Sequence, residues 1–131
     1  MVLRARRVGT EARARYAEDT ERAERLPELL EAARKAEEEL VRARRDGADA
    51  VELNRLGVAY DAALTEAVRA AYARQRVLVG LRGYEDRIYR RRRLARPEVK
   101  EVTEFAERLL TLREQHRLHG IERVPRDPVA A

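Results

Sequence analysis

The strongest structural pattern in the chain lies in "DAVELNRLGVAYDAALTEAVRAAYARQRVLV", residues 49–79. Its apolar residues recur every three or four positions, which is the spacing of one face of an α-helix. Asp49 is a natural N-cap, and Glu52 follows three residues later, as in a capping box. Seven alanines fall between residues 59 and 73, so one surface has little side-chain bulk and another helix can approach it closely. We therefore predict a long inner helix of a bundle.

The same alanine-rich surface also suits contact with a second copy of the chain. Large apolar side chains are few in this sequence, so burial of a shared face in a homo-oligomer is a reasonable expectation. The predicted self-association face consists of Ala59, Ala63, Ala67, Ala70 and Ala71.

Similar periodicity predicts helices on both sides of this stretch. Their approximate ranges are 10–25, 27–45, 84–96 and 97–119, with "GLRG" at 80–83 as an interruption. Thr10 is a candidate cap for the first helix, and Gly120 ends the last one. The connections are short, which favours antiparallel neighbours. We predict an all-α, elongated antiparallel bundle of about four helices with an extended C-terminal tail. It forms a single domain over residues 1–131, with 1–9 and 121–131 loosely ordered.

Composition excludes several classes of function. The chain has 131 residues, the size of one ordinary domain, and lacks cysteine, so neither a disulfide nor a thiolate metal site is possible. It also lacks serine, which removes a serine nucleophile. Its longest apolar runs, such as "VLVGL" at 77–81, are too short to span a bilayer. We expect a cytoplasmic protein without a cofactor or a membrane partner.

The positive charge is concentrated in one segment. Residues 81–100 hold eight basic and three acidic residues, an excess equal to the net charge of +5 of the whole chain. Elsewhere both signs alternate, as on solvated helix faces. Arginine is abundant throughout, so the run of four at 90–93 by itself can arise from composition. The location of the excess charge is the stronger observation.

This segment is the predicted binding surface. Arginine's planar guanidinium matches phosphate oxygens in a two-point contact, and a tyrosine ring can stack on an unpaired base. On the helix, Ile88 and Leu94 are expected to form the buried stripe. The predicted site residues are Arg82, Arg87, Tyr89, Arg90, Arg91, Arg92, Arg93 and Arg96. We predict a non-enzymatic module that binds a polyanion, most favourably a nucleic-acid backbone, with little sequence selectivity.

Two alternatives remain open. In the first, the chain is an oligomeric adaptor whose arginines pair with acidic protein surfaces, such as the glutamates at 37–39. The second rests on Arg113 and His119, whose spacing resembles the Arg…His element of HEPN-type ribonucleases, which are also all-helical. That resemblance implies metal-free RNA cleavage by residues that meet across a dimer, although Glu114 departs from the family's pattern. His116 and His119 also have a spacing that suits one metal ion, but a structural zinc site needs further ligands, so no metal is predicted.

Overall fold

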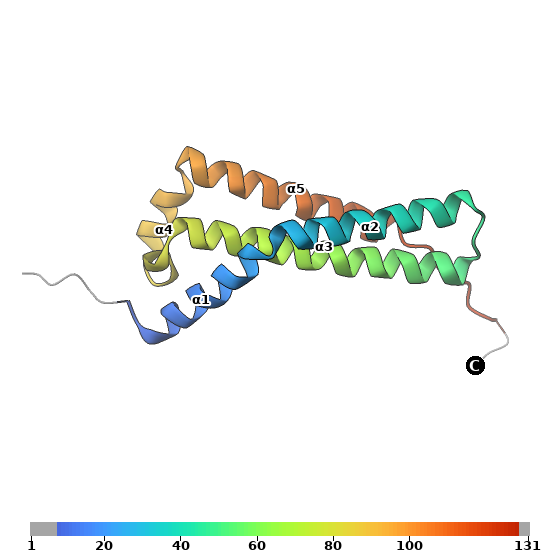
Figure 1. Ribbon diagram of the computed structural model, residues 1–131, viewed down its shortest axis with the longest axis horizontal. Helices are drawn as coiled ribbons and strands as arrows, with labels where there is room; N and C mark the ends of the chain where they lie inside the picture. Colours follow the sequence, from blue (N-terminus) through green and yellow to red (C-terminus); the bar gives the residue numbers. More distant parts are fainter. Residues whose placement is uncertain (1–7, 129–131) are drawn as a thin grey trace, which may run out of the picture. The chain divides into compact units, whose positions relative to one another are not determined.

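The computed structural model describes residues 8–128, and all of its regular elements in that range are helical (Figure 1). Within residues 8–128 the all-α prediction is confirmed, with five α-helices where about four were predicted. None of the helices in this range is long and apolar enough to cross a membrane. The elements are α1 (Thr10–Glu24), α2 (Leu26–Arg45), α3 (Ala50–Val79), the short 3₁₀ helix η1 (Leu81–Tyr84), α4 (Arg87–Leu94) and α5 (Pro97–His119).

The chain divides into two compact units. The first comprises the residues up to Leu26 together with Arg69–Glu107, and the second comprises Pro27–Val68 together with the residues from Arg108 onward. Both α3 and α5 contribute residues to each unit. The first unit therefore holds α1, η1 and α4, and the arginine-rich segment belongs entirely to it. The predicted single domain over residues 1–131 stays a prediction.

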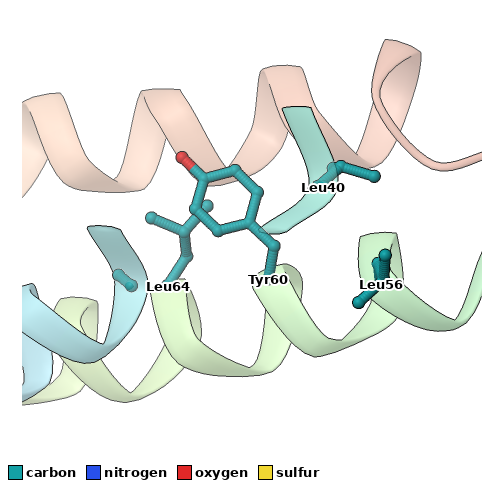
Figure 2. Close-up of a cluster of buried hydrophobic side chains, with 5 residues drawn as sticks. Leu40, Leu56, Tyr60 and Leu64 are labelled. Atoms are coloured by element: carbon teal, nitrogen blue, oxygen red, sulfur yellow. The ribbon is translucent and has the colours of Figure 1, made fainter. Parts of the chain in front are cut away.

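The core of the second unit lies between α2 and α3. Leu40 of α2 and Leu56, Tyr60 and Leu64 on successive turns of α3 are buried, and Ala33 completes the cluster (Figure 2). The Tyr60 hydroxyl donates a hydrogen bond of 2.7 Å to Glu37. Burial, followed by this hydrogen bond, raises the pKa of Tyr60 above its ordinary value of 10.0. The apolar stripe of residues 49–79 thus packs as its periodicity predicts.

The N-terminus of α3 has the predicted cap. The Glu52 backbone N–H donates to the Asp49 carboxylate at 2.9 Å. The Glu52 side chain does not return to the cap, because it pairs instead with Arg55 one turn further along, at 2.6 Å. The cap is therefore one half of a capping box.

The interruption at 80–83 ends α3 and delays the next helix. Gly80 has a φ of 107°, a left-handed conformation that glycine adopts without steric cost, and the helix stops there. Asp86 then caps α4 by accepting a 2.9 Å hydrogen bond from the Tyr89 backbone N–H. Helix α4 consequently begins at Arg87, three residues later than predicted. At the start of α1, Thr10 is not the cap: Gly9 occupies that position, and its N–H donates to Glu85 at 2.6 Å.

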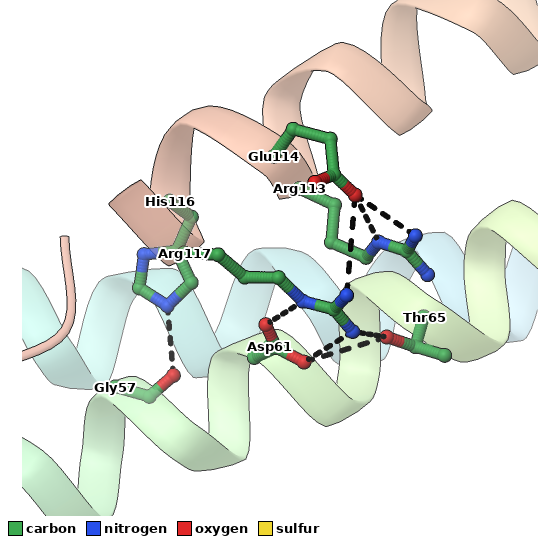
Figure 3. Close-up of polar contacts among 7 residues, drawn as sticks. All are labelled: Gly57, Asp61, Thr65, Arg113, Glu114, His116 and Arg117. Atoms are coloured by element: carbon green, nitrogen blue, oxygen red, sulfur yellow. Dashed lines mark hydrogen bonds and ion pairs between the residues drawn. The ribbon is translucent and has the colours of Figure 1, made fainter. Parts of the chain in front are cut away.

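The second unit also fixes the beginning of the C-terminal tail. His116 of α5 is buried, and its Nε2 lies 2.7 Å from the carbonyl oxygen of Gly57 (Figure 3). Asn54 donates to the carbonyl of Glu122 at 2.7 Å, and Arg44 donates to the carbonyl of Gly120. Gly120 and Glu122, just after α5, are therefore held by hydrogen bonds from α2 and α3. The predicted loose order of residues 121–131 stays a prediction. Residues 129–131, and residues 1–7 of the predicted loose segment at 1–9, lie outside the described residues.

The alanine-rich surface is largely covered by the chain itself. Ala67, Ala70 and Ala71 have no exposed area, whereas Ala63 is half-buried and Ala59 is exposed. Small side chains allow close approach, and here the approaching groups come from the same molecule. The predicted self-association face is therefore not available as a whole to a second copy.

Candidate nucleic-acid interface

Helix α4 and the residue before α5 present five exposed arginines. These side chains are accessible because α4 has only eight residues and none of them is buried. Within the described part of the chain, no carboxylate forms an ion pair with any of the five. We call them the arginine patch: Arg87, Arg90, Arg91, Arg92 and Arg96.

Arg93, also predicted to bind the partner, has a structural contact instead. Its guanidinium donates to the carbonyl oxygens of Leu78 and Val79 at 3.1 and 3.3 Å. These carbonyls belong to the last turn of α3, where the intrahelical donors have run out and the helix dipole is negative. A positive side chain at that point stabilises the helix end. Arg93 thus fastens α4 to the end of α3.

Arg82 and Tyr89 contact each other. The Arg82 guanidinium lies 5.1 Å from the centre of the Tyr89 ring, and it also pairs with Asp86 at 3.3 Å. One face of the ring is therefore covered, and the Tyr89 side chain is half-buried. The structure places both residues beside the arginine patch, with Arg82 stacked on the ring that was predicted to stack on a base.

The prediction of a buried stripe on α4 is wrong for Ile88. This side chain is 68% exposed, whereas Leu94 is half-buried and lines a pocket. The helix is too short to bury a complete face, and it packs against η1. Ile88 consequently stands among the arginines as an apolar side chain open to solvent.

A pocket of about 460 Å³ lies in the first unit, next to the arginine patch. It is formed where the side chains of α1, the end of α3, η1 and α4 converge. Its lining residues are Arg15, Glu18, Asp19, Gln75, Arg76, Val79, Gly83, Tyr84, Arg90 and Leu94. Arg90 is thus the member of the arginine patch that also faces this pocket.

Asp19 organises one wall of the pocket. Its carboxylate is only 7% exposed and accepts hydrogen bonds from Arg76, at 2.8 and 3.0 Å, and from the Tyr84 hydroxyl, at 2.5 Å. Burial acts to raise the pKa of Asp19, but the hydrogen bonds from Arg76 and Tyr84 outweigh it and hold the pKa below 3.8. Burial and the bond to Asp19 raise the pKa of Tyr84. The carboxylate is therefore a fixed acceptor in a closed network, not a poised acid.

The sequence does not predict this network as a whole, but it contains one signal of it. The apolar stripe of α1 includes Ala12, Tyr16 and Ala23. Asp19 lies on the same stripe, three residues after Tyr16 and four before Ala23. An acid at a buried position of a helix needs a partner, because an unpaired charge is costly to bury. That reasoning identifies Asp19 but not Arg76, which is 57 positions away in the sequence.

The two residues of the ribonuclease resemblance, Arg113 and His119, lie in different surroundings. Arg113 binds the neighbouring Glu114 at 2.9 Å, and its side chain is mostly buried (Figure 3). His119 is exposed, while His116 is the buried histidine. In the described part of the chain, no three histidine, aspartate or glutamate residues come together in a way that could hold a metal ion.

No protein-family model, curated protein or solved structure shows significant similarity to this chain.

Proposed function

We propose that this protein is a non-enzymatic helical module that binds a polyanion, most favourably a nucleic-acid backbone, through the arginine patch. The observation that carries the proposal is that five arginines on and beside one short helix face solvent. No carboxylate of the described residues neutralises them. Arginine binds phosphate oxygens in a two-point geometry, and release of condensed counterions drives such binding.

The arrangement supports binding with little sequence selectivity. At 100° per residue, Arg87, Arg90 and Arg91 share one side of α4, whereas Arg92 points to another side. Side chains that surround a helix in this way can reach phosphates on more than one strand or turn. They are poorly placed to contact a row of base edges in one groove. The proposal therefore assigns these arginines to backbone contacts.

The adaptor alternative has less support. Its self-association face is largely buried, and two of the glutamates at 37–39 already have partners: Glu37 accepts from Tyr60, and Glu38 pairs with Arg34. An acidic protein surface remains an outcome of the test below. The lack of cysteine and the short connection between α2 and α3 are consistent with a cytoplasmic antiparallel bundle, which this proposal retains.

Fluorescence anisotropy with a labelled oligonucleotide over a series of salt concentrations tests the proposal. The variant Arg91→Ala/Arg92→Ala should bind more weakly, and its slope of log K against log salt should flatten by about one unit per lost phosphate contact. A matched control is Arg34→Ala/Arg55→Ala, which removes the same charge from exposed residues that already pair with glutamates. Equal slopes for both double variants and the original protein would contradict the proposal.

A further inference from the structure

The pocket beside the arginine patch has a charge pattern of its own. Arg15 reaches it from α1 and Arg90 from α4, and neither pairs with a carboxylate among the described residues. Of the two carboxylates in the lining, Asp19 is occupied by Arg76 and Tyr84, which leaves Glu18. Two unpaired cations therefore face one unpaired acid, so the pocket favours a ligand with an anionic group.

The rest of the lining suits a flat, partly apolar group. Val79 is buried, Leu94 is half-buried, and Tyr84 contributes its ring while its hydroxyl is fixed on Asp19. Gln75 donates from its amide nitrogen to Thr103 at 2.8 Å, which leaves its carbonyl oxygen as an acceptor. A nucleotide has these features, because its base is a flat ring with polar edges and its phosphate is an anion. The volume of about 460 Å³ lies within the range of small-ligand sites.

From these contacts we infer that the pocket accepts one unstacked nucleotide of a single-stranded nucleic acid. Its phosphate lies at Arg15 and Arg90, and its base lies against Val79, Tyr84 and Leu94. This inference rests on the proposed function and specifies its ligand. Arg91 and Arg92 follow Arg90 on α4 and can meet the neighbouring phosphates of the same strand, which a free nucleotide lacks. A paired base in a duplex stays in its stack and cannot enter without unpairing.

Two matched pairs of variants test the inference in the full chain. Arg13 and Arg15 are both exposed on α1, but only Arg15 lines the pocket. Arg90 and Arg91 are adjacent on α4, and only Arg90 lines it. Binding of a single-stranded oligonucleotide, a duplex of equal length and a free mononucleotide is measured by anisotropy or calorimetry at one salt concentration.

We expect Arg15→Ala to weaken binding of the single strand about tenfold and Arg13→Ala to weaken it no more than about twofold, because only the first loses a charge-assisted phosphate contact. Arg90→Ala should likewise weaken binding of the single strand more than Arg91→Ala does. With duplex, the members of each pair should have equal effects. Circular dichroism of each variant verifies that the helices are retained.

The inference is wrong if Arg13→Ala and Arg15→Ala have equal effects on the single strand while all the nucleic acids still bind, and the proposed function then stands without the pocket. If no nucleic acid binds, the proposed function fails together with the inference. If the free mononucleotide binds as tightly as the oligonucleotide, the ligand of the pocket is a free nucleotide and not one nucleotide of a strand, and the inference is wrong.

Discussion

The Arg76 guanidinium holds the Asp19 carboxylate at two points, with distances of 2.8 and 3.0 Å, and thereby joins α1 to α3. Replacing the carboxylate by an amide in Asp19→Asn leaves its size unchanged but removes its charge. Because Arg76 is partly exposed, water replaces some of the lost interaction, and we expect a loss of about 1–3 kcal/mol in the free energy of unfolding. Urea denaturation followed by circular dichroism measures it. Glu18→Gln, at an exposed neighbour, should change stability by less than about 0.5 kcal/mol.

The same carboxylate makes stability depend on pH. The pKa of Asp19 is lower in the folded chain than its ordinary value of 3.8, so its contribution is present above that value and is lost as the pH falls below it. We expect the difference in unfolding free energy between the original protein and Asp19→Asn to shrink as the pH is lowered from 7 to 3. A difference that stays constant across this range would show that the charge of Asp19 is not what stabilises the fold.

Arg92 and Arg93 are neighbours with opposite predicted roles. Arg93→Ala removes the hydrogen bonds to the last carbonyls of α3, so it should lower the unfolding free energy by about 1 kcal/mol. Arg92→Ala should leave stability nearly unchanged, because the side chain is exposed and unpaired among the described residues, and should weaken oligonucleotide binding instead. Denaturation and anisotropy on both variants separate the two roles. If the two variants have the same profile, the structural assignment of Arg93 is incorrect.

His116 and His119 provide another matched pair. His116 is 8% exposed, binds the carbonyl of Gly57 and lies with its ring 4.6 Å from that of Tyr60. His116→Ala leaves a cavity and removes this hydrogen bond, so we expect a loss of about 2–3 kcal/mol in thermal or chemical denaturation. His119→Ala should be close to neutral. Cleavage of single-stranded RNA by the original protein that His119→Ala abolishes would instead favour the ribonuclease alternative.

The helices and most of their ends can be predicted from the amino-acid sequence, because they depend on local interactions. The spacing of Leu56, Tyr60 and Leu64 predicts the buried face of α3, and Asp49 caps it through the backbone three residues away. Gly80 marks the end of that helix because few other residues adopt a positive φ. The start of α4 was misplaced by three residues, since a 3₁₀ turn and the beginning of a helix have similar sequence patterns.

Helix packing determines which of the arginines near α4 are held by groups distant in the sequence and which stay exposed. Seven arginines between residues 82 and 96 are alike in sequence, yet Arg93 contacts carbonyls fourteen and fifteen positions earlier, while Arg91 and Arg92 face water. The Tyr84 hydroxyl donates a hydrogen bond to Asp19, which is 65 positions away in the sequence. Contacts of this range depend on how helices pack, and no local pattern encodes them. The free positive charge, and with it the candidate site, is what remains after the packed helices have satisfied the other side chains.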